Sequence, residues 1–348
     1  MIKSEFRATT EADAPAVSAF LQRVFGFGPE LPLVEPRNMR WRCWEERPDW
    51  SGSRGYVVTR DERILAHGVA VPLALRSGDR RLKVVNLIDW AADPSAVGSG
   101  VVLLRRIAQM ADAIVSTAGS DMTLKILPSL GFKTLGQVTR FARPVRPLRR
   151  IAGRKPAWKL PGKVVRAWWW SRQAPYRPLE GWTVRRVPPE QLASASIPWP
   201  KASPGLAFFE RDAAIIGYYL RCPATPMELY TVARHGAVRG YFVLARVLTQ
   251  ARIVDFRVES DGREDWSDLI ELAVRQAKEH HAVAEVATIA TDAGIRSALA
   301  NCGFQPRGDY PLLFLPRKGI EPPEEPVRVH MIDGDQAYFN RNENEFWA

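Results

Sequence analysis

The sequence predicts an α/β protein made of two similar halves, each a mixed sheet flanked by helices. Short apolar segments typical of strands alternate with helical segments in both halves of the 348-residue chain. Ile88-Asp89-Trp90 is matched by Val254-Asp255-Phe256 166 positions later, and Gly131-Phe132 by Gly303-Phe304 172 positions later. The nearly constant offset indicates an internal duplication. A composition of 46% hydrophobic and 25% charged residues is typical of a globular protein with a buried core.

Each half contains the elements of one sheet. In the first half we expect a strand at 5–8 and a helix from Ala16 to Val24, with Thr10 and Asp13 forming its capping box. The apolar patterning also predicts strands at 55–59, 64–71, 82–90 and 113–116. It further predicts a helix at 101–107 and a short helical piece that ends at Gly131. In the second half the patterning predicts a hairpin of 229–233 and 238–245, a strand at 251–258, a helix through 270–274 and another that ends at Cys302.

Proline-rich segments separate these halves. From Arg143 onward closely spaced prolines exclude a long helix or a central strand, and a second proline-rich region covers 320–326. We therefore expect a first domain at 1–142, a basic linker at 143–180, a second domain at 181–318 and a C-terminal tail at 319–348. Residues 327–332 of the tail are expected to add a strand to one of the sheets, and Asp333-Gly334-Asp335 to form a turn.

The positive charge is concentrated near the linker. Residues 122–179 contain no Asp or Glu and 14 Lys and Arg, which exceeds the net charge of +11 for the whole chain. The remainder is therefore slightly acidic, and nucleic-acid binding, which spreads basic residues over a domain, is not expected. Within the linker, 158–172 predicts a short amphipathic helix with Val164, Val165, Trp168 and Trp169 on one face. We favour docking of this face between the domains, and peripheral membrane contact is the alternative.

Cysteine and histidine usage bears on compartment and metals. The three cysteines are far apart with no CxxC pair, which favours a reducing compartment and hence a cytoplasmic protein. The five histidines are scattered, so we expect no metal site. No signal peptide or membrane-spanning segment is expected from the apolar patterning.

Gly98-Ser99-Gly100 is the motif with chemical meaning. It lies between a strand and a helix, where backbone N–H groups are unpaired and the positive end of the helix dipole lies behind them. A phosphate suits such a site, and a turn that needs glycine only for its geometry is the alternative. The motif fits neither the Rossmann nor the Walker pattern, because a third glycine at the right spacing and a Gly-Lys-Ser/Thr are both missing.

The order of strand, Pro94, glycine loop, Leu103-Leu104-Arg105-Arg106 helix, strand and closing Gly131-Phe132 resembles the GCN5-related N-acetyltransferase (GNAT) family. The resemblance covers 5–142 well and 181–316 more faintly, so the chain looks like a tandem GNAT protein. It implies that the loop binds the pyrophosphate of acetyl-CoA and that Gly131-Phe132 lies beside the pantetheine arm. The implied loop residues are Val97, Gly98, Ser99, Gly100 and Val101.

The sequence departs from the family at several positions. Ser95 stands where Gln or Arg is usual, and Leu127 and Leu299 stand where many members have a Tyr general acid. In the second copy, 261–265 carries three carboxylates in place of the phosphate loop, and these would repel a pyrophosphate. The first domain is therefore interpreted as the acyl-CoA binder and the second as degenerate.

Three residues near the loop are candidates for catalysis. Asp89 lies in an apolar strand beside Trp90, and burial there would raise its pKa and suit it to act as a base. A structural carboxylate is the alternative, and the presence of Asp255 in the degenerate copy supports it. Asn86 is a candidate for orienting a water or the acceptor, and Ser116 for approaching the thioester.

These observations favour an acetyl-CoA-dependent N-acetyltransferase in which an amine attacks the thioester directly. The acceptor is expected to be a small amine, with an amino sugar or polysaccharide precursor as one example. A catalytically degenerate scaffold of the same fold is one alternative, and an aminoacyl transferase of the FemAB type is another. The glycine loop counts against the last, because such enzymes have no need of a site for the CoA pyrophosphate.

Overall fold

A computed structural model of the chain describes residues 4–339 except 30, 118, 151–161, 163–164, 167, 171–178, 202–204 and 261. All predicted strands and helices of the two sheets are present there, and Thr10 and Asp13 form the predicted capping box. In this described part no helix is long and apolar enough to cross a membrane.

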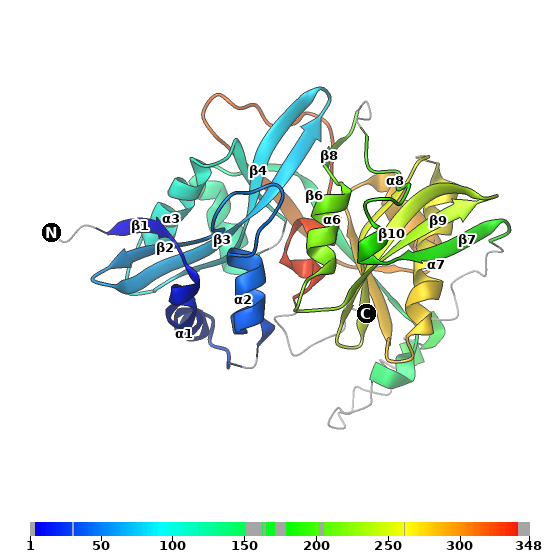
Figure 1. The fold of residues 1–348 in the computed structure, drawn as a ribbon, viewed down its shortest axis with the longest axis horizontal. Coiled ribbons are helices and arrows are strands. Elements are labelled where there is room, and N and C mark those ends of the chain that lie inside the picture. Colours follow the sequence, from blue (N-terminus) through cyan, green and yellow to red (C-terminus); the bar gives the residue numbers. More distant parts are fainter. Residues whose placement is uncertain are drawn as a thin grey trace.

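The first half runs from β1 to β6 (Figure 1). Its elements are β1 (Glu5–Ala8), α1 (Ala14–Phe25), α2 (Pro36–Cys43), β2 (Gly55–Arg60), β3 (Arg63–Ser77), β4 (Arg80–Ala92), α3 (Ser99–Ala108), β5 (Ala113–Ser116), α4 (Asp121–Ile126) and β6 (Lys133–Pro144).

The second half repeats this order and ends in a compact C-terminal segment. Its elements are β7 (Trp182–Val187), β8 (Ala207–Phe209), α6 (Ala213–Leu220), β9 (Met227–Arg234), β10 (Ala237–Val247), β11 (Gln250–Val258), α7 (Arg263–Glu279), β12 (Glu285–Ala290), α8 (Ala293–Asn301), β13 (Gln305–Pro316), β14 (Val327–Arg328) and the 3-10 turns Met331–Asp333 and Asp335–Ala337.

The two halves share one sheet because they exchange their last strands. The strand order is β1-β2-β3-β4-β5-β13-β6-β12-β11-β10-β9-β7. Thus β13 of the second half pairs with β5 of the first, and β6 of the first half pairs with β12 of the second. β6 was not predicted as a strand, and its last two residues, Arg143 and Pro144, were assigned to the linker. Pro144 lies at the end of β6, where a missing N–H is tolerated.

Each half contains one parallel strand pair that separates along its length. β4 and β5 pair in parallel from Val84 as far as Asn86 and Val115, and then diverge. β11 and β12 do the same as far as Arg252 and Ala287. A shift of strand register lies near each divergence. In the first half it adds an extra residue to β4 around Asp89, and in the second half it adds one to β11 around Val254.

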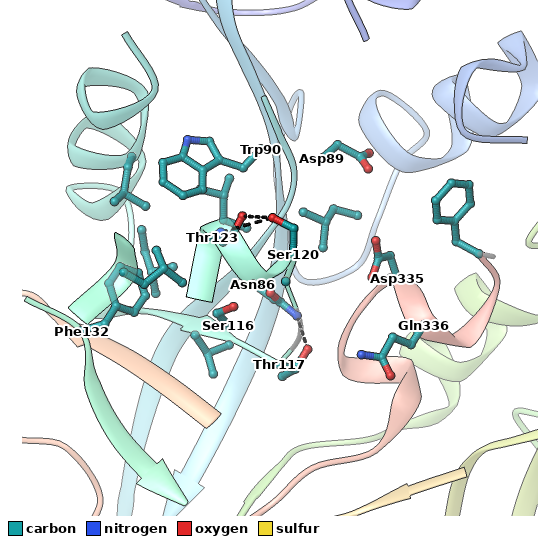
Figure 2. Close-up of a pocket in the computed structure, with 18 of the residues that line it drawn as sticks. Asn86, Asp89, Trp90, Ser116, Thr117, Ser120, Thr123, Phe132, Asp335 and Gln336 are labelled. Atoms are coloured by element: carbon teal, nitrogen blue, oxygen red, sulfur yellow. Dashed lines mark hydrogen bonds between the residues drawn. The ribbon is translucent and has the colours of Figure 1, made fainter. Parts of the chain in front are cut away.

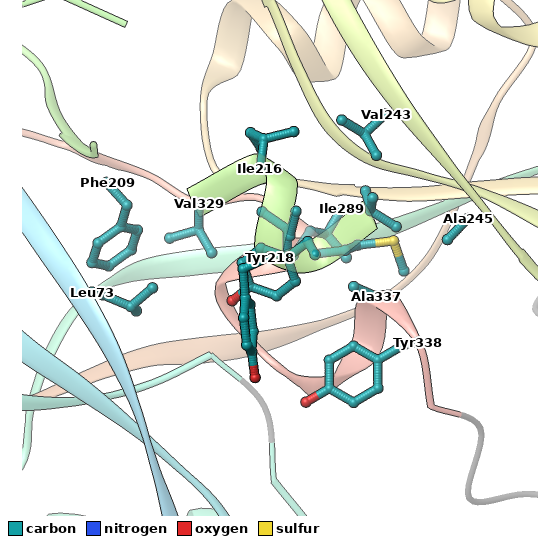
Figure 3. Close-up of a cluster of buried hydrophobic side chains, with 14 of the residues drawn as sticks. Leu73, Phe209, Ile216, Tyr218, Val243, Ala245, Ile289, Val329, Ala337 and Tyr338 are labelled. Atoms are coloured by element: carbon teal, nitrogen blue, oxygen red, sulfur yellow. The ribbon is translucent and has the colours of Figure 1, made fainter. Parts of the chain in front are cut away.

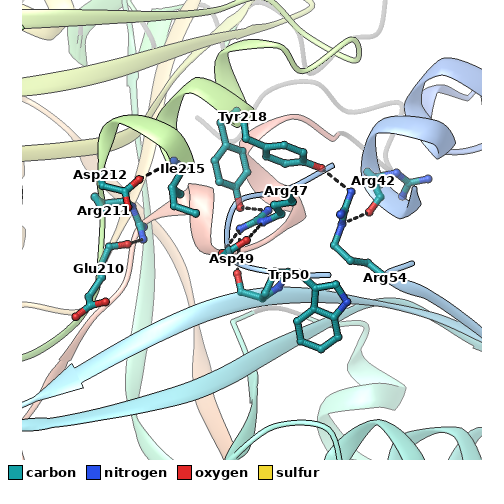
Figure 4. Close-up of polar contacts among 12 residues, drawn as sticks. Arg42, Arg47, Asp49, Trp50, Arg54, Glu210, Arg211, Asp212, Ile215 and Tyr218 are labelled. Atoms are coloured by element: carbon teal, nitrogen blue, oxygen red, sulfur yellow. Dashed lines mark hydrogen bonds and ion pairs between the residues drawn. The ribbon is translucent and has the colours of Figure 1, made fainter. Parts of the chain in front are cut away.

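Helices α2 and α6 hold the halves together on one face of the sheet (Figures 3 and 4). The Trp41 ring stacks on the Tyr218 ring at 4.9 Å, and both side chains are buried in the largest apolar cluster. Arg54 donates hydrogen bonds to the Trp41 carbonyl (2.8 Å) and to the Tyr218 hydroxyl (3.2 Å). Trp41 of α2 is therefore part of the core between the halves.

The tail agrees with what the sequence predicted, and the linker differs from it. β14 adds a strand, as expected, by pairing with β8, and Asp333-Gly334-Asp335 joins two 3-10 turns, in agreement with the predicted turn; Asp333 is fully buried. In the linker the described residues 162, 165–166 and 168–170 are helical, whereas Lys163 and Val164 lie outside the described residues. The predicted docking of its apolar face is wrong for the described residues, since Val165, Trp168 and Trp169 are 64%, 45% and 55% exposed. Instead Trp170 lies against the guanidinium of Arg307, at 4.5 Å. Membrane contact stays a prediction.

Candidate functional site

A cavity of about 320 Å³ opens where β4 and β5 diverge (Figure 2). Its walls come from β4, α3, β5, the segment from 117 to Phe132, β6, β11 and residues 335–339 of the C-terminal segment. The polar lining residues are Asn86, Asp89, Ser116, Thr117, Ser120, Thr123, Arg140, Arg252, Asp335 and Gln336. The three predicted catalytic residues, Asp89, Asn86 and Ser116, are thus brought to one cavity.

Asp89 lies in the β4 irregularity and is only 1% exposed. Its φ of +52° is rare for a residue with a side chain, so the surrounding structure must hold it in place. Arg42 of α2, also buried, donates to the Asp89 carboxylate and forms an ion pair with it. Because the carboxylate is engaged by a buried guanidinium and not by the open cavity, the geometry favours a positioning role for Asp89.

Asn86 and Ser116 stand at the point of divergence. The Asn86 side-chain nitrogen donates to the Thr117 hydroxyl (2.9 Å) and to the Asp333 carbonyl (2.7 Å), so both of its donors are occupied. Asn86 therefore connects β4 to β5 and to the C-terminal segment. Ser116 is the last residue of β5 and is 7% exposed at the cavity wall.

The glycine loop lies at the start of α3, and none of residues 97–101 is among those that line the cavity. Gly98 has φ +85° and is the N-cap of α3, and a methyl group added there would meet nothing within 4 Å. Ser99 is 7% exposed and donates to the Leu65 carbonyl, so its hydroxyl anchors the loop. The Val97 side chain is 98% exposed. The Val101 N–H donates to the Gly98 carbonyl and is thus used within the turn.

Gly100 connects the loop to the cavity. Its carbonyl accepts a hydrogen bond from the Trp90 indole at 3.0 Å, and Trp90 lines the cavity. A methyl group on Gly100 would lie 3.1 Å from the Ala92 side chain and 3.3 Å from the Trp90 nitrogen. The glycine therefore lets α3 pack closely on β4, a role that differs from both the phosphate site and the turn geometry considered from the sequence.

Positive charge lies near the loop although Ser95 replaces the expected Gln or Arg. Asp93 accepts hydrogen bonds from Ser95, from Arg63 at 2.6 Å and from Arg23 at 3.3 Å. These donors hold the pKa of Asp93 well below its usual range. Arg63 and Arg23 are more than half exposed, so one carboxylate at the loop is accompanied by two accessible guanidinium groups.

Sequence reasoning missed the residues that reach the cavity from the exchanged strand β6 of the first half and from the second half. Arg140 comes from the exchanged strand β6, Arg252 from β11, and Asp335, Gln336 and Phe339 from the C-terminal segment. No short-range motif marks them, because strand exchange and chain-end docking bring them there from distant positions. In the described residues no group of three His, Cys, Asp or Glu is placed to hold a metal ion.

Comparisons of structure relate this fold to known proteins. The chain is similar to a tandem GNAT protein from the clavulanic acid biosynthesis pathway, with a TM-score of 0.56, 13% identity and coverage of 92% of this chain and 100% of that one. It is similar to a GCN5-related N-acetyltransferase from Anabaena variabilis ATCC 29413 (TM-score 0.56, 10% identity, 90% and 72% coverage). It is also similar to N-myristoyltransferase of Saccharomyces cerevisiae with bound myristoyl-CoA (TM-score 0.58, 12% identity, 90% and 82% coverage).

At the level of sequence, no protein-family model and no curated protein matches the chain. The three similar structures share its fold at low identity, and two of the similarities cover more than four fifths of both chains. The chain therefore has the GNAT fold in its tandem form, as the sequence resemblance predicted.

Proposed function

We propose that the protein is an acyl-CoA-dependent N-acyltransferase that uses acetyl-CoA and an amine acceptor. The observation that carries the proposal is the cavity at the β4–β5 divergence, which adjoins the glycine loop at the start of α3. In this arrangement the helix start, which would bind an anion, follows β4 in the chain, and the partly apolar cavity is lined by residues of the same strand. An extended molecule with a charged end and a reactive end fits that arrangement.

The charged end would be the pyrophosphate. The start of α3 supplies the positive end of a helix dipole, and Gly98 in the left-handed region lets the backbone approach the ligand closely. Arg63 and Arg23 add guanidinium groups, which suit phosphate oxygens. Within the proposed loop Val97 to Val101, the N–H groups of Ser99 and Val101 donate to the Ala96 and Gly98 carbonyls, so the other backbone N–H groups would bind the pyrophosphate.

The reactive end would lie in the cavity. Apolar side chains such as Leu104, Leu127 and Phe132 line the route from α3 inward and suit the pantetheine arm. The amine nitrogen would attack the thioester carbonyl, forming the C–N bond, and the C–S bond would then break to release the CoA thiol. Before the attack the ammonium must lose a proton to a base at the cavity wall.

Binding of acetyl-CoA to variants of Val97 tests this proposal. The side chain is 98% exposed, so a change there leaves the fold intact. Val97→Glu places a negative charge at the loop and Val97→Lys a positive one. By calorimetry we expect Val97→Glu to weaken binding about fivefold, a cost of about 1 kcal/mol, and Val97→Lys to leave it equal or tighter. The difference should shrink as salt is added.

Two results would contradict the proposal in different ways. Absence of acetyl-CoA binding by the unmodified protein would reject the acyl-CoA site and favour a scaffold without turnover. Equal binding by the Glu and Lys variants would place the pyrophosphate elsewhere. An aminoacyl transferase of the FemAB type would likewise bind no acetyl-CoA at this loop.

A further inference from the structure

Large apolar side chains are exposed at one end of the sheet and on the linker helix beside it. Leu148, which follows β6, is 71% exposed, and Leu248, in the turn between β10 and β11, is 65% exposed. In the linker, Val165, Trp168 and Trp169 are exposed and share one face, because they are spaced by three and four residues in a helix. We call these five side chains the end surface.

Backbone contacts place the two leucines of the end surface at the same end of the sheet. The Arg146 N–H donates to the Ala284 carbonyl (3.0 Å), and the Ala284 N–H donates to the Thr249 carbonyl (2.8 Å). The chain just before Leu148 and the chain just after Leu248 therefore flank the start of β12 on its two sides.

The linker helix is attached near the same end. Trp170 lies against the Arg307 guanidinium, at 4.5 Å. Arg307 belongs to the first turn-like part of β13, where Gln305 pairs with Ala142 of β6, so the contact lies close to the end of β6. Trp170 is partly buried, whereas the two tryptophans before it are exposed. The helix thus contacts the sheet through one tryptophan and presents the other two to solvent.

The charge around the end surface is positive. Residues 122–179, which include the end of β6 and the linker, contain 14 Lys and Arg and no Asp or Glu. Among them Arg149 is exposed beside Leu148. Lys278 of α7 is exposed at the same end, where its carbonyl accepts a hydrogen bond from Arg146, and the neighbouring Glu279 offsets one charge. The end surface is therefore apolar with a basic surround.

We propose that the end surface binds a lipid bilayer that contains anionic lipid. Tryptophan side chains favour the headgroup level of a bilayer, because an apolar ring and a polar N–H are both satisfied there. The leucine and valine side chains would enter the acyl boundary, and the surrounding Lys and Arg would meet lipid phosphates. A nucleic acid would match the charge but would leave the leucines in water. The proposal does not depend on acyl transfer.

Co-sedimentation of the full chain with vesicles tests the proposal. Vesicles made of equal parts of phosphatidylcholine and phosphatidylglycerol are compared with vesicles of phosphatidylcholine alone. We expect the unmodified protein to bind the mixed vesicles at least about tenfold more tightly, because each basic residue near an anionic surface adds several-fold affinity. This preference should shrink as salt is added.

Paired substitutions test which residues carry the binding. Replacing Trp168 and Trp169 together by Ser should weaken binding to the mixed vesicles at least about tenfold, because two indoles would no longer be buried. Leu148→Ser combined with Leu248→Ser should weaken it several-fold. Met122→Ser is the matched control, because Met122 is 72% exposed on α4 and lies outside the end surface. It should bind as the unmodified protein does, and urea unfolding should show that all variants remain folded.

Several results would overturn the proposal. The unmodified protein could fail to sediment with the mixed vesicles, or the tryptophan variant could bind them as tightly as the unmodified protein. Equal losses in the tryptophan variant and in Met122→Ser would mean that binding does not belong to the end surface. Binding of a single-stranded RNA oligonucleotide without vesicle binding would assign the surface to RNA. A dimer that the tryptophan substitutions dissociate, again without vesicle binding, would assign it to a second copy of the chain.

Discussion

The two halves of the molecule differ at the point where their parallel strands separate. Both carry an aspartate near an irregular strand position, Asp89 and Asp255, and both pair that aspartate with a buried arginine. In the first half the opening is a cavity beside a glycine loop. In the second half the opening holds the C-terminal segment, and the corresponding helix begins with the acidic residues Glu264 and Asp265.

This difference shows what the two halves keep in common although their openings have different contents. The aspartate–arginine pair is present in the half whose opening is filled, so it cannot depend on a ligand. We conclude that the pair stabilises the irregular strand in both halves. The loop and the content of the opening distinguish the half that is proposed to act from the half that supports it. Each prediction below changes a feature that the halves share or one in which they differ.

Removing the paired arginines should have the largest effect. Arg211→Met leaves Asp255 and Asp333 as buried carboxylates without their cation, and Arg42→Met leaves Asp89. Loss of one partner of a buried pair costs about 3–5 kcal/mol. We expect a loss of this size for Arg42→Met and a larger one for Arg211→Met, as measured by urea unfolding.

Arg239→Met is the matched control, because Arg239 forms an exposed ion pair with Glu259. It should cost less than about 1 kcal/mol. If Arg42→Met lowered the free energy of unfolding no more than this control, the Arg42–Asp89 pair would not stabilise the fold. Asp89 and Asp255 would then not have equivalent structural roles.

Two buried histidines, one in each half, should make stability depend on pH. Burial lowers the pKa of His67 and of His330 to about 4, from 6.5. As pH falls below 6.5 the unfolded chain takes up protons that the folded chain refuses, so stability is lost between pH 6.5 and 4. Each histidine contributes about 1.4 kcal/mol per pH unit. Burial raises the pKa of Asp333 to about 6, which acts in the opposite direction below that pH.

The net effect should be a loss of about 2 kcal/mol between pH 7 and pH 5, measured by urea unfolding at both values. In His67→Gln only His330 and the opposing Asp333 remain, so the loss should fall below about 1 kcal/mol. If the pH dependence of stability were unchanged in this variant, His67 would not be its main source. Burial would then not account for the contributions of the two histidines.

Much of the fold was predictable from the sequence, because the apolar periodicity and the repeat offset depend on local residue order. The strand at 113–116 and the position of α3 followed directly, as did the cavity residues Asn86 and Asp89 of β4 and Ser116 of β5, which lie near the point where the two strands diverge. The exchange of β6 and β13 was not predictable, because strands pair through backbone groups that are common to all residues. The sequence therefore does not indicate which strand will be the neighbour. Asp335 was missed for a related reason, because only docking of the chain end places it at the cavity.

The smallest effect is expected at the two helix-start glycines. Gly98 has φ +85°, whereas Gly262, at the start of α7, has φ −64°. Gly98→Ala places alanine in the left-handed region, which lowers the free energy of unfolding by about 1 kcal/mol. Gly262→Ala needs only a shift of the Ser260 side chain, whose oxygen lies 2.9 Å from the added methyl group. Urea unfolding should therefore give Gly98→Ala at least twice the loss of Gly262→Ala. Equal losses would mean that the left-handed turn is not specific to the first half, and the proposed anion site would lose its conformational basis.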